Sequence, residues 1–156
     1  MIKINIPGRY NLELKNIIFD YNGTLAVDGI ISDYIKNMLI KLSDSLDVYI
    51  LTADTYGTVR TQCKDLPISI KTFSEGNSTE FKKAFIEKLS CENSIAVGNG
   101  LNDVEMLKKA ALSIAVIGNE GCASQAIISS HITCKNISDV FDVILKKDRV
   151  KATLRD

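Results

Sequence analysis

The sequence predicts an α/β domain with a Rossmann-like parallel sheet that carries helices on both faces. Short apolar runs rich in β-branched residues alternate along the chain with segments of helical period. The length of 156 residues suits one domain, and no low-complexity stretch or Pro-rich linker divides it. Apolar strands that alternate with helices in this way indicate a parallel sheet buried on both faces.

The predicted core strands include five short apolar runs, at residues 16–19, 48–51, 68–70, 94–97 and 112–117. A last strand is expected around His131. Helices are predicted where apolar residues recur at i, i+3, i+4 and i+7, because this spacing places them on one helix face. These segments are 33–42, 81–89, 104–111 and 137–145, the last preceded by Asn136 as N-cap.

The beginning of the chain has a different pattern. Apolar residues alternate there with polar ones on both sides of Pro7-Gly8, which predicts a β-hairpin. The alternating residues are Ile2, Ile4, Ile6, Leu12 and Leu14. We therefore divide the single domain into an appended hairpin (1–15), an α/β core (16–146) and a C-terminal tail (147–156). The hairpin is either an edge element without a functional role or an edge that forms a dimer.

The formal net charge is zero, with 19 Lys and Arg against 19 Asp and Glu. This balance argues against a nucleic acid or an anionic membrane surface as partner. No apolar run reaches the roughly 18 residues of a membrane span, and no secretory signal pattern is present. We expect a cytoplasmic protein whose four cysteines, which form no C-x-x-C pair, are reduced.

Two loops that follow predicted strands carry the candidate chemistry, because ligands of parallel α/β sheets bind beyond the carboxyl ends of strands. Residues 20–25 read Asp-Tyr-Asn-Gly-Thr-Leu, and residues 98–103 read Gly-Asn-Gly-Leu-Asn-Asp. Each loop has a simpler interpretation when taken alone. Asn22-Gly23 suits a tight turn, and the second loop suits a connection to a helix cap at Asn102 or Asp103.

Taken together, the two loops resemble the haloacid dehalogenase (HAD) superfamily of phosphohydrolases. Its first motif is Asp-x-Asp-Gly-Thr, and its fourth is often Gly-Asp-Gly-x-Asn-Asp. Thr52, just after the strand at 48–51, resembles the family's phosphate-binding Thr or Ser, and Lys82 resembles its lysine, with Lys83 as the alternative. The resemblance covers about residues 16–144 and extends to the small soluble proteins related to the phosphorylation domain of P-type ATPases.

The resemblance implies a Mg²⁺-dependent phosphohydrolase in which Asp20 is the nucleophile and forms an aspartyl-phosphate. A carboxylate that attacks a phosphate dianion meets like-charge repulsion, so such a site needs a divalent cation and fixed donors. The implied catalytic residues are Asp20, Asn22, Thr52 and Lys82. The implied phosphate contacts are Gly23, Thr52, Ala53, Lys82 and Asn102. The implied metal ligands are Asp20, Asn22 through its backbone carbonyl, Asn99 and Asp103. The expected substrate is a phosphorylated small molecule, an acyl phosphate or a nucleotide.

Two asparagines depart from the family pattern. Asn22 stands where the family usually has an Asp that acts as general acid and base, and an amide cannot exchange a proton at neutral pH. Loss of such help costs about 10²- to 10⁴-fold, so we expect slow turnover or a restriction to good leaving groups. Asn99 stands where the family has a metal-binding Asp, which predicts weak Mg²⁺ affinity.

These departures leave alternatives open. The site is either tuned for particular substrates or is a noncatalytic module that binds a phosphate or a nucleotide. Both asparagines precede Gly, a context that favours deamidation to Asp, which is a third possibility. The chain between the motifs has no room for a large cap domain, and capless relatives often close their site by oligomerising. A dimer or tetramer is therefore expected.

Other candidates receive structural interpretations. His131 has no partner acid by motif, and residues 118–121 suit a turn between a strand and a helix. Asp28-Gly29 suits the turn of a small flap over the site, and Asp54 suits the N-cap of a helix over residues 55–64.

Overall fold

The computed structural model describes residues 1–54, 57–74 and 76–156. Six strands form its central sheet: β3 (Asn16–Asp20), β4 (Asp47–Thr52), β5 (Ser69–Thr72), β6 (Ser94–Gly98), β7 (Leu112–Val116) and β8 (Ile132–Cys134). All neighbouring strands are parallel, in the order β5-β4-β3-β6-β7-β8. The strand order reverses between β3 and β6, and this is the point where ligands bind in such sheets. The predicted parallel α/β fold is confirmed.

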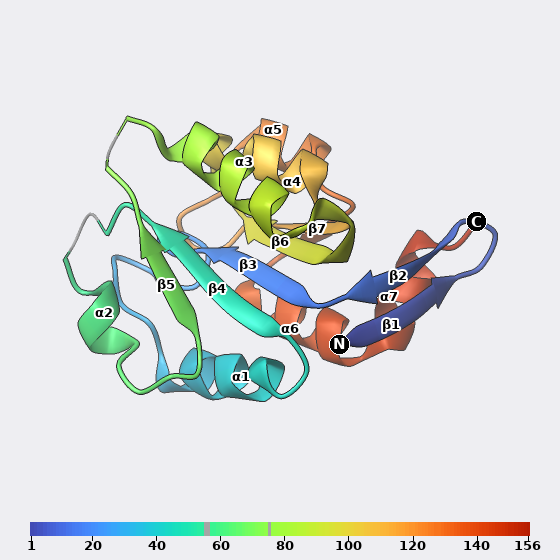
Figure 1. Ribbon diagram of the computed structural model, residues 1–156, viewed down its shortest axis with the longest axis horizontal. Coiled ribbons are helices and arrows are strands. Elements are labelled where there is room, and N and C mark those ends of the chain that lie inside the picture. The colour runs from blue at the N-terminus through green and yellow to red at the C-terminus, as the bar shows by residue number, and fades with distance from the viewer. Residues whose placement is uncertain (55–56, 75) are drawn as a thin grey trace.

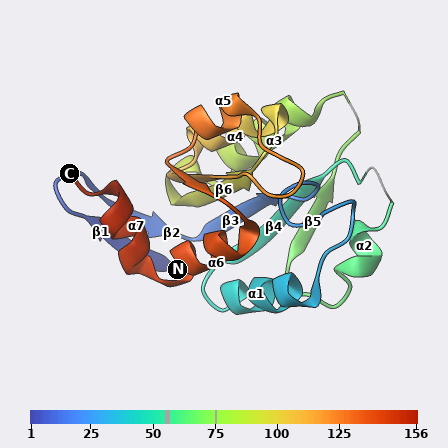
Figure 2. The ribbon, with the colours of Figure 1, turned by 180° about the vertical axis from the view of Figure 1, so that it is seen from behind.

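Helices cover both faces of the sheet (Figures 1 and 2). On one face lie α3 (Ser78–Leu89), α4 (Val104–Lys109) and α5 (Ser124–Ile128). On the other lie α1 (Asp33–Ser43) and α6 (Ile137–Leu145). The short α2 (Val59–Gln62) lies beside β5 and β4, and single turns of 3-10 helix span Cys91–Asn93 and Leu101–Asp103. No helix in the described part of the chain has the length and apolarity needed to span a membrane.

Strand β3 shows how the sequence directs side chains to the two layers. All five of its residues are buried, because helices cover both faces of the sheet at this central position. Ile17 and Phe19 pack into the core on the α1 and α6 side, and Ile18 packs into the core on the α3 and α4 side. Because side chains alternate along a strand, Asp20 follows Ile18 to the α3 side.

The predicted N-terminal hairpin is present as β1 (Ile2–Ile6) and β2 (Tyr10–Leu14), an antiparallel pair separate from the main sheet. It leads directly into the amino end of β3, so it lies at the opposite edge of the sheet from Asp20 (Figure 1). Its Ile and Leu side chains are buried in the same apolar core as residues of α6 and of the last helix.

The segment predicted as a C-terminal tail differs in the structure, where Lys147–Leu154 form helix α7. Val150 is buried and Leu154 is partly buried, and the helix packs against β1. These are the helix's two large apolar side chains, four residues apart in a run of polar ones. Two such residues make too short an apolar stripe to predict a helix from the sequence. In the structure, the hairpin supplies the apolar surface that covers them.

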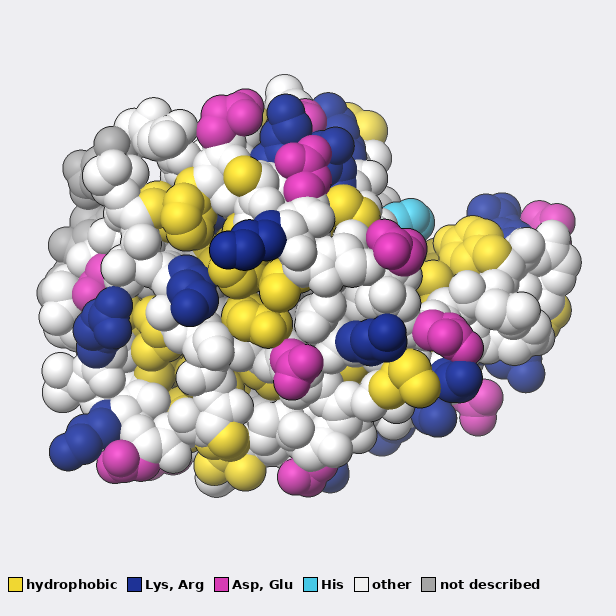
Figure 3. Space-filling model, viewed as in Figure 1, with side chains coloured by type: hydrophobic (Ala, Val, Ile, Leu, Met, Phe, Trp, Pro, Cys, Tyr) yellow, Lys and Arg dark blue, Asp and Glu magenta, His cyan; other side chains and the backbone are white. Residues whose placement is uncertain are grey.

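Charge is distributed unevenly between these two parts of the chain. Residues 1–15 and 146–156 contain eight basic and three acidic side chains, whereas residues 16–145 contain 11 basic and 16 acidic ones. On the face shown in Figure 3, acidic and basic side chains are interspersed over α3 and α4, where Lys109 pairs with Glu87 and Lys108 with Glu105. The zero net charge of the chain is therefore a sum over two oppositely charged parts.

Short connections replace a cap domain. After β3 the chain makes a flap in which Asp28 and Gly29 both have positive φ and Val27 bridges Ile30, as in a two-residue hairpin turn. The side chain of Gln62 holds this flap, because its Nε2 donates to Gly29 O and its Oε1 accepts from Ile31 N at 3.0 Å.

Asp54 and His131 both have structural hydrogen bonds. The Asp54 carboxylate accepts hydrogen bonds from the N–H groups of Thr58 and Val59 at 3.0 and 3.1 Å and so caps α2. This helix is shorter than predicted, and Thr55 and Tyr56 lie outside the described residues. His131 has a structural place, since its Nδ1 accepts a hydrogen bond from Ser113 N at 3.0 Å between β7 and β8.

Candidate active site

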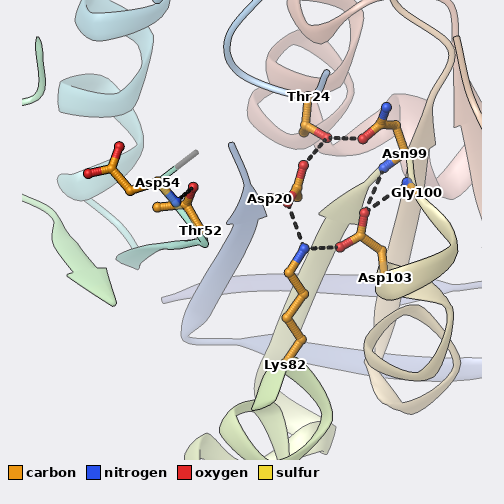
Figure 4. Close-up of polar contacts among 8 residues, drawn as sticks. All are labelled: Asp20, Thr24, Thr52, Asp54, Lys82, Asn99, Gly100 and Asp103. Carbon is orange, nitrogen blue, oxygen red and sulfur yellow. Dashed lines mark hydrogen bonds and ion pairs between the residues drawn. The ribbon is translucent and has the colours of Figure 1, made fainter. Parts of the chain in front are cut away.

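Asp20 stands at the centre of the candidate site, as the last residue of β3 at the carboxyl edge of the sheet (Figure 4). Its side chain is almost fully buried, and its two oxygens have different partners. Oδ1 lies 2.6 Å from Lys82 Nζ, and Oδ2 accepts a hydrogen bond from the Thr24 hydroxyl at 3.3 Å. Both contacts orient the carboxylate.

Lys82 lies on the buried face of α3, with 0% of its surface exposed. Its ammonium group contacts Asp20 Oδ1 and Asp103 Oδ1, both at 2.6 Å. A buried ammonium group is costly unless it is paired, and here two carboxylates pair with it. The alternative, Lys83, is about one-third exposed and lies 3.8 Å from Glu80 on the surface. The structure thus brings Lys82, and not Lys83, to Asp20.

Asp103, a predicted metal ligand, has a different place in the structure. Its carboxylate is fully buried, and Oδ2 accepts hydrogen bonds from the N–H groups of Asn99 and Gly100 at 3.0 and 2.9 Å. With Oδ1 bound to Lys82, both oxygens already have partners. A Cβ on Gly98 would come within 2.4 Å of Asp103 Cγ, so only glycine fits there. Asp103 therefore positions Lys82 and the loop after β6 and does not line the pocket.

The two motif loops meet at Gly23 and Asn99. Gly23 has φ of +76°, and a Cβ at this position would lie 2.4 Å from Asn99 Nδ2. Asn99 Oδ1 accepts a hydrogen bond from the Thr24 hydroxyl at 3.2 Å, and its Nδ2 donates to Gly121 O at 3.0 Å. Thr24 thus links Asp20 to Asn99. Thr24 belongs to the Asn-Gly-Thr motif, but no role was predicted for it.

These residues border a pocket of about 360 Å³. Its lining consists of Asp20, Asn22, Thr52, Ala53, Phe73, Gly76, Ser78, Asn99, Gly100 and Asn102. Six of the predicted site residues are in this lining, whereas Gly23, Lys82 and Asp103 lie behind it. The other four lining residues, Phe73, Gly76, Ser78 and Gly100, were not predicted. Phe73 directly follows a strand at the carboxyl edge, which is the position where ligand contacts are expected.

Thr52 ends β4 with its side chain almost fully buried. Its hydroxyl oxygen accepts a hydrogen bond from Asp54 N at 2.9 Å. That bond uses a lone pair of the oxygen and leaves the hydroxyl proton to be donated to a pocket ligand. The arrangement suits a phosphoryl oxygen at this end of the pocket.

Burial and neighbouring charges together set the pKa values of Asp20 and Lys82. Desolvation, with the nearby Asp103 carboxylate, raises the pKa of Asp20 to about 6, against the opposing effects of Lys82 and Thr24. Burial lowers the pKa of Lys82, but Asp20 and Asp103 outweigh it and the net direction is upward. Lys82 is therefore a fixed positive charge at neutral pH.

The donors that face the pocket are of the kind that Mg²⁺ prefers. Asn22 Oδ1 is buried and has no hydrogen-bond partner among the described residues, and a buried oxygen of this kind calls for a ligand. Asp20 and Asn99 contribute further oxygens to the same pocket. No group of three or more His, Cys, Asp or Glu in the described residues could hold a metal. The site fits Mg²⁺ by donor type, with one carboxylate as its charge.

Comparisons with known proteins agree with this geometry. A family model described as haloacid dehalogenase-like hydrolase matches residues 82–144. An uncharacterized protein of Methanocaldococcus jannaschii is 46% identical over 85 residues, which are 52% of this chain and 91% of that protein. A soluble P-type ATPase-like phosphatase of the same organism is 25% identical over 154 residues, which cover 92% of this chain and 56% of that protein.

Solved structures show the same fold over nearly the whole chain. The cobalt-bound deoxy-D-mannose-octulosonate 8-phosphate phosphatase of Haemophilus influenzae has a TM-score of 0.72 at 14% identity, covering 92% of this chain and 94% of that chain. A Moraxella catarrhalis 3-deoxy-D-manno-octulosonate 8-phosphate phosphatase, in complex with magnesium, phosphate and KDO, has a TM-score of 0.65 at 21% identity, covering 91% and 94%. With its fold, partial family match and relatives in agreement, this chain has the capless fold of the haloacid dehalogenase-like hydrolases and is distantly related to a soluble P-type ATPase-like phosphatase.

Proposed function

We propose that this chain is a Mg²⁺-dependent phosphohydrolase whose nucleophile is Asp20. The observation that carries the proposal is the setting of this carboxylate. It lies at the point where the strand order reverses, borders the pocket, and has one oxygen held by Lys82 and the other by Thr24. The match of residues 82–144 to a haloacid dehalogenase-like hydrolase model supports the reaction class.

The proposed reaction has two steps. A carboxylate oxygen of Asp20 forms a bond to phosphorus while the bond from phosphorus to the leaving-group oxygen breaks, which gives an aspartyl-phosphate and the released leaving group. Water then attacks phosphorus, the bond to Asp20 breaks, and phosphate leaves. Thr52 and Asn102, with the backbone N–H group at Ala53, would contact phosphoryl oxygens as charge shifts between them. Gly23, a predicted phosphate contact, is left out because its N–H donates to Ala26 O at 2.9 Å.

Three residues would hold the metal in this proposal: Asp20, Asn22 and Asn99. Mg²⁺, when bound, would supply positive charge that reduces repulsion between Asp20 and the phosphate. Asp103 is left out of this set because it is fully buried and does not border the pocket. With one carboxylate among the donors, we expect weak Mg²⁺ affinity.

Asn22 restricts the substrates. It lines the pocket beside Asp20, but its amide has no acidic proton to transfer to a departing oxygen. Leaving groups that depart without protonation suffer least, which favours acyl phosphates and other good leaving groups over alkyl esters. The sugar phosphate named for the solved neighbours is not carried over, because identities of 14% and 21% support only the fold.

A second candidate function is a noncatalytic phosphate- or nucleotide-binding module. The pairing of Asn22 with Asn99 favours it, because both amides keep hydrogen-bonding shape while they remove charge from the metal and acid positions.

Deamidation of either residue would restore an Asp. In this reaction the backbone nitrogen of the following glycine attacks the Asn side-chain carbonyl. Hydrogen bonds oppose the attack at both places, because Gly23 N donates to Ala26 O and Gly100 N donates to Asp103 Oδ2, both at 2.9 Å.

The test is phosphate release from acetyl phosphate, ATP and p-nitrophenyl phosphate, with Mg²⁺ or with EDTA. The expected result is release that needs both Mg²⁺ and Asp20, so that Asp20→Asn is inactive. Asp28→Asn is the matched control, because it makes the same chemical change in the flap turn, outside the pocket lining. A silent parent with active Asn22→Asp or Asn99→Asp variants would favour the binding module instead.

A second comparison isolates the role of Asn22. Asn22→Asp should raise the rate of hydrolysis of an alkyl ester such as glycerol phosphate by about 10²- to 10⁴-fold. The rate of hydrolysis of acetyl phosphate should change much less. Equal gains in rate on both substrates would contradict the placement of Asn22 at the acid–base position.

The dimer or tetramer that a capless site suggests stays a prediction, which light scattering would test.

A further inference from the structure

We infer that the pocket selects a substrate whose only anionic group is the phosphoryl group, carried on an uncharged planar leaving group that lies against Phe73. The inference rests on the proposed function and narrows its substrate class to neutral aryl and acyl phosphates. It disfavours phosphorylated acids and nucleoside di- or triphosphates.

The first support is the absence of a second cation. None of the described residues that line the pocket is Lys, Arg or His. Thr55, Tyr56 and Glu75 lie outside the described residues, and none of these residue types is a cation at neutral pH. Lys82 is the cation beside the pocket, and its ammonium group is already shared by Asp20 and Asp103 at 2.6 Å each.

The second support is the sign of the surrounding charge. The two carboxylates and one ammonium group of the cluster sum to one negative charge, and the charges of a bound Mg²⁺ and of a phosphoryl dianion would cancel each other. Residues 16–145 carry 16 acidic side chains against 11 basic ones. A carboxylate or second phosphate on the leaving group would lose water in this field with no cation to pair with. Such desolvation is costly.

The third support is the composition of the wall. Phe73 follows β5, its N–H donates to Thr52 O at 3.3 Å, and its ring lies 4.9 Å from the ring of Phe81. These contacts fix the ring on one side of the pocket. Neutral hydrogen-bonding groups of Asn99, Asn102 and Ser78 line the rest. An aromatic ring prefers to pack against another flat ring, by about 0.5–1.5 kcal/mol beyond the area buried.

The decisive comparison uses two aryl phosphates of the same shape. Para-carbamoylphenyl phosphate and para-carboxyphenyl phosphate differ by one negative charge at the far end of the leaving group. We expect kcat/KM to be about tenfold to a hundredfold higher for the carbamoyl compound, from the cost of bringing a carboxylate toward the negatively charged cluster with no cation to pair with it. Equal values, or a preference for the carboxylate, would overturn the inference.

Two variants test the residues behind this preference. Phe73→Leu should raise KM for para-carbamoylphenyl phosphate about threefold to tenfold while leaving KM for acetyl phosphate, which has no ring, nearly unchanged. Ser78→Arg adds a cation to the lining and should raise kcat/KM for the para-carboxyphenyl compound relative to that for the carbamoyl compound. Thr79→Arg is the matched control, since Thr79 adjoins Ser78 in α3 and is not in the lining. Similar effects of the two arginine substitutions would contradict the assignment of Ser78 to the pocket wall.

A binding experiment separates this inference from the proposed hydrolase. Para-carbamoylbenzylphosphonate and para-carboxybenzylphosphonate cannot be hydrolysed, and calorimetric titration with Mg²⁺ measures their affinities directly. Tighter binding of the neutral compound with no turnover of any phosphate would overturn the hydrolase and leave the selectivity standing. Equal or tighter binding of the carboxylate, or no binding of either compound, would overturn the selectivity.

Discussion

The carboxyl edge of the sheet and the hairpin with α7 are stabilised in opposite ways. At the carboxyl edge, one buried ammonium group of Lys82 balances two buried carboxylates, Asp20 and Asp103. In the hairpin, alternating Ile and Leu side chains share an apolar core with α6 and α7. At the site, stability therefore depends on the charge balance of a few groups, whereas the far end spreads its stability over many small apolar contributions.

The largest expected effect comes from Lys82→Met. Removal of the cation leaves two carboxylates buried and unpaired, which should cost about 3–5 kcal/mol of unfolding free energy and abolish phosphate release. Urea denaturation at pH 7 measures the loss. Lys83→Met, one residue along α3 and partly exposed, should change stability by less than about 0.5 kcal/mol. Comparable losses of unfolding free energy in the two variants would contradict the role of Lys82 in balancing the buried carboxylates.

Leu14→Ala tests the apolar end. Leu14 is fully buried where the hairpin meets the core, so its truncation should cost about 2–5 kcal/mol. Because this site is remote from the pocket, KM for acetyl phosphate should not change. Glu13→Ala, beside it on the exposed face with a surface ion pair to Lys3, should cost less than about 1 kcal/mol. A changed KM in Leu14→Ala would show that the two regions are coupled.

Asp20→Asn should stabilise the metal-free protein at pH 8. The folded protein holds the Asp20 proton more tightly than the unfolded chain, with a pKa of about 6. Asp20 therefore favours folding at low pH, and this contribution disappears as the pH rises through about 6. Asn resembles the protonated acid, so the variant should gain up to about 3 kcal/mol at pH 8 and nothing near pH 4. Urea titrations in EDTA at both pH values would decide, and a variant less stable than its parent at pH 8 would contradict the account.

The smallest expected effect is at a helix cap between the two regions. Asn136 Oδ1 accepts a hydrogen bond from Asp139 N at 2.9 Å at the start of α6, which packs against both the sheet and α7. Asn136→Ala should lower the unfolding free energy by about 0.5–2 kcal/mol, as measured by thermal denaturation. Ser32→Ala, which removes the cap of α1, is the matched variant. No loss in either variant would refute the role of these caps.

The sequence predicted more of the fold than of the site. Apolar runs and helical periods located the central strands and main helices, because burial on both faces leaves a clear pattern. Helix α7 was missed because its stripe of Val150 and Leu154 is too short to stand out. Motif positions brought Asp20, Asn22 and Thr52 to the same pocket.

The direction in which a side chain turns was beyond prediction. Asp103 was expected at the metal, but its carboxylate turns toward Lys82 and two backbone N–H groups. Nothing in a linear motif distinguishes an acid that binds a metal from one that holds a lysine. Phe73 was missed for a related reason, since a single aromatic residue after a strand has no pattern around it.

The uneven distribution of charge gives the molecule an electric dipole. Its two ends carry opposite excesses of five charges, so a net charge of zero does not make the protein electrostatically inert. Such a molecule orients in the field of any charged surface and is attracted end to end to others of its kind. Salt weakens these forces, since charges are screened beyond about 10 Å at 0.1 M ionic strength. Retention on both cation and anion exchangers at low salt, and its loss at high salt, is the behaviour expected of this chain.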